Sequence, residues 1–493
     1  MKKSAVVVGL IFLMALGFRL FFAFQTPNLD YDAYFNLRQV ASIQEQGLPF
    51  FEDELSFGGR TLHFIPVFPY ILGFFSFFLP LLFTLKLIPN IFAASIVIIN
   101  YLIAKRITKD ENSSLFCAFI SAFIPLFIAE TFNSVSVYTL VIPLTFLSLY
   151  FLMASEKKRY ISYFLISTAL LAILHPSSFL LVIGLLLYAL MRKLEHLSPK
   201  REKIESILFF TFFAVWINFI LYKKALLAHG ASVIWQNIPS SIISLYFSET
   251  DILAAIVAIG LIPVLLGIYI IYRYVFREKQ REIYMLIGMA LACFFLLWPG
   301  LLTPDIAFMF LGVILVILFA QGYKLFFDYL EKTKVASFRK WFIIFFVVVF
   351  VFSSIIPSLY FANQKVEETI EDIDAFLWIR DNAQEGDVVA ASLTEGHVIT
   401  AIAKRKNVVD SNFLLIKDAE ERYADLIEIY SSRYKTVAIP LLNKYDIKYI
   451  VLSSVTKAEF GIRDIYYLDE QCFKLVYRGK TRIYESLCKV EEV

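Results

Sequence analysis

Residues 4–38 read SAVVVGLIFLMALGFRLFFAFQTPNLDYDAYFNLR, and this stretch decides the class of fold. A long apolar run, residues 4–24, leads directly into a polar segment that carries two aspartates. A helix needs about 20 mostly apolar residues to cross a bilayer, because every backbone polar group must be bonded internally in hydrocarbon. The run is too long for a removable signal peptide and lacks its small-residue cleavage site, so we predict a spanning helix that is retained.

The rest of the 493-residue chain continues this pattern. Apolar residues make up 59% of it and charged residues 18%, against about 45–50% and about 25% in soluble domains, so a soluble globular fold is excluded. Residues 65–83 are apolar, but Pro66, Pro69 and Pro80 interrupt a helical hydrogen-bond ladder, so we predict a re-entrant or interfacial helix there. We predict a polytopic α-helical membrane protein with about eleven spans, near residues 4–24, 88–104, 113–130, 137–154, 161–175, 177–191, 207–222, 251–272, 284–299, 305–322 and 341–361.

Basic residues in short loops set the orientation of such a protein. Alternate loops, beginning with Lys2 and Lys3, hold 22 Lys and Arg, whereas the loops between them hold five. This bias predicts a multi-pass protein of the plasma membrane with a cytoplasmic N-terminus. The loops at 25–64, 130–136 and 223–250 would then lie outside.

The charge density changes near the end of the chain. Charged side chains make up about 13% of residues 1–361 and about 31% of residues 362–493, so we predict a transmembrane domain followed by a soluble extracytoplasmic domain. Short β-branched runs alternate with helical patterns in the tail, which predicts a small parallel α/β sheet. The expected strands are 388–391, 408–409 and 447–452, and the expected helices are 365–382, 396–405 and 418–432.

A hairpin is expected at the end of the tail, with strands at 473–477 and 482–487. A turn centred on Lys480 would place Cys472 opposite Cys488. A disulfide and two separate reduced cysteines both remain open, because an oxidising exterior permits the bond without requiring it. The four cysteines have no metal-like spacing, and a net charge of +3 gives no support for nucleic-acid binding.

The first external loop, 25–64, is the most informative segment for chemistry. Asp30 and Asp32 follow the first span by a few residues, so their carboxylates would stand at the membrane surface. There a carboxylate can act as a general base for an acceptor hydroxyl, or it can hold a divalent cation against a phosphate. A solvated loop tip, or an N-cap for the amphipathic run 33–43, explains the same residues.

Basic residues near this loop are candidates to bind the phosphate. Arg60 carries a fork of donors that suits phosphate oxygens, although an ordinary polar loop would also contain it. Arg19 lies inside the first span near its outer end, where an ionisable residue is a functional candidate and snorkelling is the rival explanation. Arg38 lies six residues past Asp32.

The run Asp32-Ala33-Tyr34-Phe35-Asn36-Leu37-Arg38, with Gly47, Leu55–Arg60 and Pro66, resembles the catalytic subunits of oligosaccharyltransferases. These are C-type membrane glycosyltransferases that use polyprenyl-phosphate donors. The resemblance continues at Lys105-Arg106, at Leu140–Leu144 with Pro143, and in the tail at Trp378–Asn382 and Gly396–Asp410. It implies that Asp32 is the catalytic, metal-associated aspartate, with Mg or Mn as the ion. Asp30 is an extra carboxylate, as in relatives that transfer single sugars.

Three departures from the family follow. The second acidic motif is replaced by Ser134 and Ser136, and hydroxyls are poor ligands for a hard cation, which puts the metal in doubt. The signature that grips a sequon hydroxyl corresponds to Ser392–Gly396, of which only the glycine survives, so transfer to Asn-x-Ser/Thr is not expected. The arginine that the family places near a late span is absent from Pro304–Phe308.

Four residues are candidates to contact the acceptor or its sugar. Glu249 loosely matches a family glutamate in a comparable loop, although a carboxylate there also suits the dipole of the next helix. Trp235 could stack on a sugar, although interfacial aromatic belts are the commoner reason for such a residue. His175 could contact the donor or form a structural turn, and His397 could bond an acceptor or be a surface histidine.

The sequence therefore predicts a glycosyltransferase that takes a sugar from a polyprenyl (dolichyl) phosphate. Its acceptor would be a glycan, lipid or protein on the outer face. A non-catalytic scaffold or accessory subunit that binds a lipid-linked glycan is the second hypothesis, because the second acidic motif is missing. A transporter has less support, because the charges gather at the outer face instead of mid-membrane.

Overall fold

The structure, a computed structural model, describes residues 2–197, 201–248, 251–367, 372–416 and 418–489. The chain divides into two compact units. The helical unit comprises Met1–Thr26, Leu82–Ile220 and Tyr246–Val366, and the sheet unit comprises Pro27–Leu81, Leu221–Leu245 and Glu367–Val493. Each unit is described by itself.

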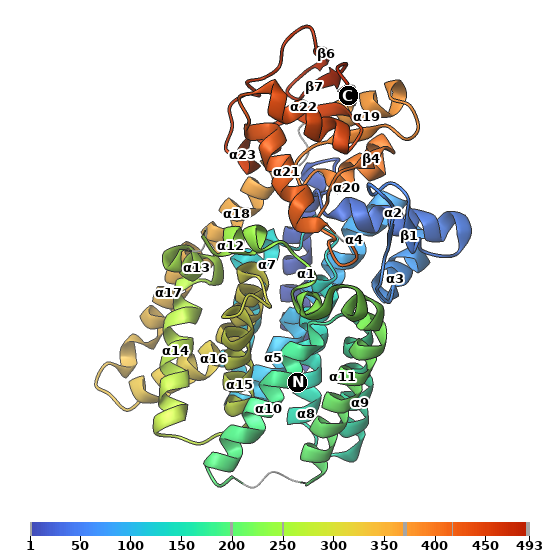
Figure 1. Cartoon of the computed structure of the whole chain (residues 1–493). Helices are drawn as coiled ribbons and strands as arrows, with labels where there is room; N and C mark the ends of the chain where they lie inside the picture. Colours follow the sequence, from blue (N-terminus) through green and yellow to red (C-terminus); the bar gives the residue numbers. More distant parts are fainter. Residues whose placement is uncertain (1, 198–200, 249–250, 368–371, 417, 490–493) are drawn as a thin grey trace. The chain divides into compact units, whose positions relative to one another are not determined.

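The helical unit has a helix in every stretch that the sequence predicts to span (Figure 1). A 3-10 turn at Ala336–Phe338 precedes α17, and a π-helical turn at Val351–Ile355 joins α17 to α18. The helices are α1 Lys2–Gln25, α4 Leu81–Ala94, α5 Ile96–Thr108, α6 Glu111–Ser121, α7 Pro125–Ala129, α8 Tyr138–Met153, α9 Lys158–Leu174, α10 Ser178–Leu194, α11 Arg201–His229, α13 Ile252–Ile259, α14 Leu261–Phe276, α15 Arg281–Leu297, α16 Pro304–Leu330, α17 Arg339–Phe350 and α18 Ile356–Glu367.

Several of these helices are long and apolar enough to cross a membrane, which confirms the predicted polytopic helical class. Within the described residues five helical runs pass by length and composition, and a sixth passes if α13 and α14, bent by 97° at Gly260, count as one broken span. The total of eleven crossings stays a prediction. The five runs are Lys3–Gln25, Leu81–Thr108, Arg201–Phe247, Pro304–Leu330 and Ala336–Glu367.

Pro80 divides the apolar stretch 65–83 between two helical segments, as the sequence indicates. The helix α3, Val67–Ser76, has ten residues and is too short to cross a bilayer. The next helix begins at Leu81, directly after Pro80, so the predicted start of the second span at residue 88 is wrong. Pro89 is tolerated inside α4.

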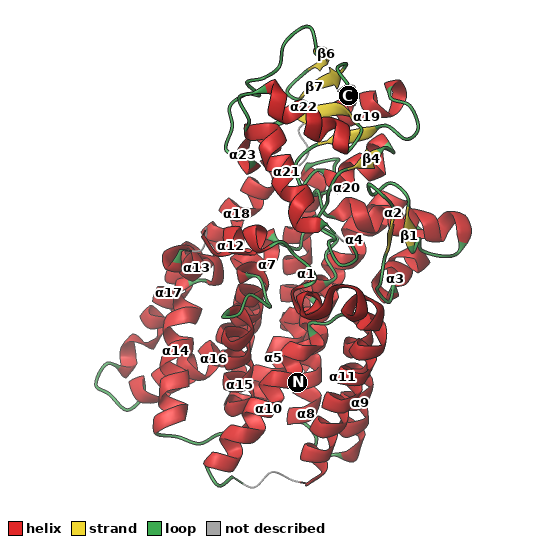
Figure 2. Ribbon diagram, viewed as in Figure 1, coloured by secondary structure: helices red, strands yellow, loops and turns green. Residues whose placement is uncertain are grey.

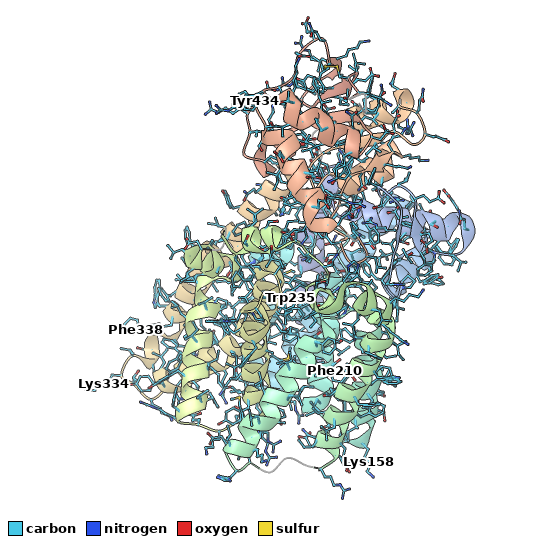
Figure 3. The ribbon with its side chains drawn as sticks, in the orientation of Figure 1. Lys158, Phe210, Trp235, Lys334, Phe338 and Tyr434 are labelled. Carbon is cyan, nitrogen blue, oxygen red and sulfur yellow. A yellow bond between two sulfur atoms is a disulfide. The ribbon has the colours of Figure 1, made fainter. Side chains whose placement is uncertain are left out.

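The core of the helical unit is centred on α16. Of the residues in the most apolar part of this helix, 89% are buried. The helix α14 packs against α16, and α10 packs against α15. At the crossing of α10 and α15 a Cβ on Gly288 would lie 2.5 Å from the Gly184 carbonyl oxygen, so the two backbones meet there. Phe210 of α11 is buried with its ring centroid 6.2 Å from that of Phe164 (Figure 3).

The sheet unit contains all strands of the described chain (Figure 2). Its five-stranded sheet has the order β4-β3-β5-β7-β6; β3 pairs in parallel with β4 and β5, and β7 pairs antiparallel with β5 and β6. The strands are β1 Glu52–Asp53, β2 Arg60–Thr61, β3 Val388–Ala390, β4 Lys406–Asn407, β5 Ile447–Leu452, β6 Phe473–Arg478 and β7 Arg482–Ser486. The helices are α2 Ala33–Gln46, α3, the 3-10 helix Gly230–Trp235, α12 Ser240–Ser248, α19 Ile373–Asn382, α20 Gly396–Val398 with the π-helical turn Ile399–Ala403, α21 Ala419–Ser431, α22 Lys435–Lys444 and α23 Ser454–Glu459.

Most predicted elements of the tail are confirmed, and two are wrong in detail. The strand expected at 408–409 is instead β4, two residues earlier, because the buried Val408 and Val409 follow the paired residues. The helix expected over 365–382 is interrupted: α18 ends at Glu367, and α19 begins at Ile373 behind the capping side chain of Asp372. Residues 368–371 lie outside the described residues. The open question at Cys472 and Cys488 resolves to a disulfide.

One core joins the three segments of the sheet unit. Ile242 belongs to the same buried cluster as Ile450 of β5, and Phe57 of the first loop packs against that cluster. Ser56 also forms a parallel bridge with Asn407, so the first loop continues the sheet beyond β4. The loop that carries Asp30 and Asp32 is therefore built into the same unit as the tail.

Candidate functional site

A buried charge cluster anchors the first loop in the sheet unit. Arg60 of β2 grips Asp410, which follows β4, through two bonds, Nη1–Oδ1 of 2.6 Å and Nη2–Oδ2 of 2.7 Å. Its Nη2 also donates to Asp53 of β1 at 3.0 Å, and Arg38 of α2 donates to the other oxygen of Asp53 at 2.9 Å. Two guanidinium groups thus neutralise two carboxylates.

The electrostatics of the cluster favour the charged forms. Burial alone would raise the pKa of Asp53, but the hydrogen bonds and charges of Arg38 and Arg60 hold this pKa below its ordinary value. Burial likewise opposes ionisation of Asp410. Electrostatic interactions with His397 and Arg60, together with the hydrogen bonds from Arg60 and Asn407, hold its pKa well below the usual range. The cluster is a permanent ion-pair network.

In this geometry neither Arg60 nor Arg38 is available to bind a phosphate. The Arg60 side chain is 1% exposed, and its terminal nitrogens donate to carboxylates and to the Asn412 carbonyl. Arg38 pairs with Asp53 and lies over the Phe50 ring, 4.5 Å from its centroid. Both predicted phosphate ligands therefore have a structural role in the sheet unit, because their charges are already compensated.

The two aspartates of the first loop lie on a turn before α2. Asp30 is half-buried, and its Oδ1 accepts the Tyr31 backbone N–H at 2.9 Å. Asp32 is exposed at the N-cap position of α2, yet its side chain makes no capping hydrogen bond to that helix. Its Oδ1 instead accepts a hydrogen bond from the Ser411 hydroxyl at 3.2 Å. Asp32 thus presents a carboxylate at the surface of the sheet unit.

Ser411 links Asp32 to a buried histidine. The Nε2 atom of His397 lies 3.0 Å from Ser411 Oγ, and its Nδ1 lies 3.8 Å from Asp410 Oδ2. His397 is 1% exposed, so the interpretation of this residue as a surface histidine is wrong. Its ring is enclosed because Gly396 packs against Asp410 and the Phe35 ring lies 5.4 Å away.

Arg19 and Lys86 are two of the buried cations of the helical unit. Arg19 of α1 donates through Nε to Asn90 Oδ1 at 2.8 Å and through Nη2 to the Thr131 hydroxyl. Lys86 of α4 donates to the carbonyls of Ala23 and Thr26 at the end of α1. Both residues are 2% exposed, and neither forms an ion pair with any residue that the structure describes. This charge of +2 is balanced only by neutral oxygens.

The residues that replace the second acidic motif do not build a cation site. Ser134 donates to the Glu130 carbonyl at 2.6 Å, and Glu130 pairs with Lys365 at 3.2 Å. Throughout the described ranges no group of three or more His, Cys, Asp and Glu side chains is placed to hold a metal ion. The described residues at this position therefore do not fit the predicted Mg or Mn.

The other acceptor candidates have separate surroundings. His175, at the end of α9, bonds Ser177 Oγ through Nδ1 at 2.8 Å, and its ring lies 5.1 Å from that of Tyr138. These contacts form the turn before α10. Trp235 is half-buried at the end of the 3-10 helix (Figure 3). Glu249 lies outside the described residues.

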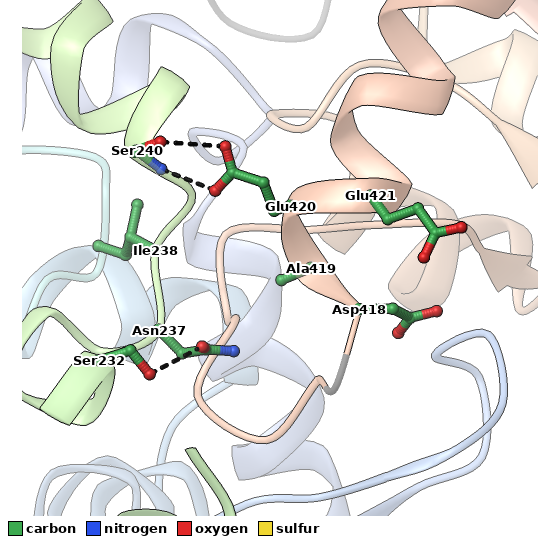
Figure 4. A pocket seen from close by; sticks show the side chains of 8 residues that line it. All are labelled: Ser232, Asn237, Ile238, Ser240, Asp418, Ala419, Glu420 and Glu421. Carbon is green, nitrogen blue, oxygen red and sulfur yellow. Dashed lines mark hydrogen bonds between the residues drawn. The ribbon is translucent and has the colours of Figure 1, made fainter. Parts of the chain in front are cut away.

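The sheet unit contains a pocket of about 470 Å³ (Figure 4). Part of its lining comes from residues that are close to Trp235 in the sequence. Glu420 there accepts the Ser240 backbone N–H at 2.9 Å and its hydroxyl at 3.1 Å. Asn237 donates to the carbonyls of Phe413 and Ile416, which fixes the wall of the pocket. Its rim is polar and acidic, formed by Ser232, Asn237, Ile238, Ser240, Asp418, Ala419, Glu420 and Glu421.

Sequence reasoning missed the partners that decide these sites. The predicted second span starts at residue 88 and so leaves Lys86 outside it, although Lys86 and Asn90 are one turn apart in an apolar stretch, which is a usable signal. Asp410 ends the family-like segment that begins at Gly396, and Ser411 follows it. No local pattern showed that they contact residues some 350 positions earlier in the chain.

Comparisons with known proteins complete the description. No protein-family model and no curated protein matches the sequence. The oligosaccharyltransferase of Archaeoglobus fulgidus matches in its apo crystal structure, with a TM-score of 0.69 and 14% identity over 91% of this chain and 69% of that chain. The same archaeal enzyme, AglB, in complex with an inhibitory peptide and a dolichol-phosphate matches with a TM-score of 0.64 and 14% identity over 90% and 69%.

A second transferase matches over its full length. ArnT from Cupriavidus metallidurans bound to undecaprenyl phosphate has a TM-score of 0.57 and 12% identity over 98% of this chain and 99% of that chain. At these identities the likeness shows the fold. The resemblance read from the first loop and the tail is therefore confirmed as a likeness to the fold of polyprenyl-phosphate-dependent C-type glycosyltransferases.

Proposed function

We propose that this chain is a glycosyltransferase that moves a sugar from a polyprenyl phosphate, such as dolichyl phosphate, to an acceptor on the outer side of the plasma membrane. One observation carries the proposal: Asp32 presents an exposed carboxylate that pairs with no cation within the described chain, while Asp53 and Asp410 beside it are neutralised. An exposed carboxylate without a paired cation, on a chain with this fold, supports a role as a base.

In the proposed reaction Asp32 is the general base. It removes the proton from an acceptor hydroxyl as that oxygen bonds to the anomeric carbon of the donor sugar. The bond from the anomeric carbon to the phosphate oxygen breaks, and its electron pair leaves with the polyprenyl phosphate. Asp30 stiffens the turn through its bond to the Tyr31 N–H.

A lipid phosphate needs positive charge to bind, and the helical unit, taken by itself, contains candidates for that role. Arg19 and Lys86 are the candidates, because neither pairs with a carboxylate among the described residues, whereas Arg38 and Arg60 of the first loop are already paired. Asn90 fixes the Arg19 guanidinium, and the α1 carbonyls fix the Lys86 ammonium, so the two charges are preorganised. The similar structures of AglB and ArnT are complexes with a dolichol-phosphate and with undecaprenyl phosphate, respectively, which supports a donor of this class.

The acceptor is proposed to be a hydroxyl of a glycan, lipid or protein other than an Asn-x-Ser/Thr sequon. The segment that corresponds to the sequon-gripping signature is internal here: Glu395 accepts hydrogen bonds from Ser392 at 2.6 Å and from Thr456 at 2.8 Å. Glu395 is 1% exposed, and these hydrogen bonds occupy its carboxylate. The pocket lined by Asp418, Glu420 and Glu421 offers carboxylates that suit sugar hydroxyls.

A panel of radiolabelled polyprenyl-phosphate sugars tests the proposal. The purified full chain is incubated with each donor and with membranes from cells that lack the gene, and the label in lipid, glycan and protein fractions is counted. We expect transfer from at least one donor, with release of polyprenyl phosphate. Tight binding of a donor without transfer to any fraction would contradict the enzyme and favour the scaffold.

A further inference from the structure

The hydroxyl of Ser411 bridges the catalytic candidate Asp32 and the buried His397. Ser411 is itself exposed, but it follows Asp410, which is locked by Arg60, by Asn407 at 2.9 Å and by the Asn412 backbone N–H at 3.0 Å. The position of the Ser411 backbone is therefore set by the buried cluster. Its side chain turns from that cluster towards α2.

The hydrogen bonds around Ser411 have a fixed direction. An ionised carboxylate only accepts, so in the contact with Asp32 the Ser411 hydroxyl must donate. A hydroxyl has one proton, and Ser411 Oγ must then accept from His397 Nε2, which consequently carries a hydrogen. The chain of donation runs from His397 through Ser411 to Asp32 Oδ1.

The far side of the histidine ring is constrained as well. Its Nδ1 is buried without a hydrogen-bond partner in the described residues and faces Asp410 Oδ2 at 3.8 Å, a distance that is too long for a hydrogen bond. The ring is packed against Phe35, which lies on the first turn of α2 three residues after Asp32. The same histidine thus contacts the helix that carries the base and the hydroxyl that binds it.

We propose that Ser411, oriented by His397, is a positioning residue that holds one oxygen of Asp32 and leaves the other free to take the acceptor proton. This inference rests on the proposed role of Asp32 as the base. A carboxylate on an exposed turn would otherwise rotate about its side-chain bonds. Holding Oδ1 limits that rotation, and orientation of a reacting group affects the rate of the chemical step more than the binding of substrate.

Variants of Ser411 test the proposal on the full chain with the donor that supports transfer. Ser411→Ala removes the bridge, and we expect kcat to fall about 10- to 100-fold with KM unchanged. Ser411→Thr keeps the hydroxyl and should restore most of kcat. Ser432→Ala is the matched control, because Ser432 is a half-buried residue of the same unit and, within the described residues, its hydroxyl bonds only Tyr434 of its own turn. It should behave as the wild type.

A second pair of variants reports on the histidine. His397→Phe keeps the ring packing but removes Nε2, so it should repeat the loss of kcat; His397→Gln supplies a side-chain N–H and should recover part of it. Wild-type kcat in Ser411→Ala, or equal losses in Ser411→Ala and Ser411→Thr, would overturn the inference. If Asp32→Asn is also fully active, the proposed function fails as well, whereas an inactive Asp32→Asn beside an active Ser411→Ala removes only the positioning role.

Discussion

The same side chain serves opposite purposes in the two units. Arg60 is buried between Asp53 and Asp410, so its charge is compensated and its donors are occupied. Arg19 is equally buried, but its partners Asn90 and Thr131 are neutral. A buried charge without a counter-ion is costly, and an anion that arrives later would reduce that cost. What distinguishes the structural Arg60 from the candidate ligand Arg19 is whether neighbouring carboxylates compensate the charge. No sequence motif shows this.

We predict that Arg19 and Lys86 bind the phosphate of the lipid donor. Arg19→Gln and Lys86→Met should each weaken the binding of tritiated dolichyl phosphate to the purified chain about 10- to 100-fold, since hydrogen bonds to charged groups contribute about 1.5–3 kcal/mol. Lys158→Gln, on an exposed residue of the same unit, should bind as the wild type. Unchanged affinity in both variants would remove this pair from the site.

Lys86 also caps the end of α1, so a loss of binding could reflect damage to the helix. Lys86→Arg keeps the positive charge and the donors to the Ala23 and Thr26 carbonyls. We expect it to keep most of the affinity. Donor affinities are compared only among variants whose unfolding temperature is close to that of the wild type.

The packing of some helices depends on how closely their backbones can approach each other. The helices α10 and α15 cross where Gly184 and Gly288 leave room, and no periodicity of apolar residues marks this crossing in the sequence. The sequence does predict where helices and strands lie, because length and alternation are local properties. It misplaces β4 by two residues, since the pairing of β4 depends on β3 and on the first loop.

We predict that Gly288→Ala destabilises the helical unit. An exchange of Gly for Ala inside a helix normally gains about 1 kcal/mol, but a Cβ at residue 288 would meet the Gly184 carbonyl oxygen at 2.5 Å and force the helices apart. We expect a net loss of about 1–3 kcal/mol, seen as a lower unfolding temperature in detergent. Gly17→Ala is the control, because nothing lies within 4 Å of its added Cβ, and it should be neutral or stabilising. An equal response of both variants would contradict the close approach.

The sequence predicts less about the assembly of the whole molecule. A membrane body with a charged tail follows from composition, and the likeness to C-type transferases follows from the first loop and the tail. The sheet unit, however, is built from three segments that are far apart in the chain, and its core joins Phe57 and Ile242 to the tail. Asp32 can be proposed from a local motif, whereas Ser411 and Asp410 can be proposed only from tertiary contacts.

The central claim is that Asp32 takes the proton of the acceptor. Its most direct test is the rate of polyprenyl phosphate release from a labelled donor by Asp32→Asn, compared with Asp381→Asn, an exposed aspartate of the same unit whose only ion pair in the described chain joins it to Arg380. We predict a loss of about 10²- to 10⁴-fold for Asp32→Asn with donor affinity unchanged, and wild-type release for Asp381→Asn. Release at the wild-type rate by Asp32→Asn would contradict the account.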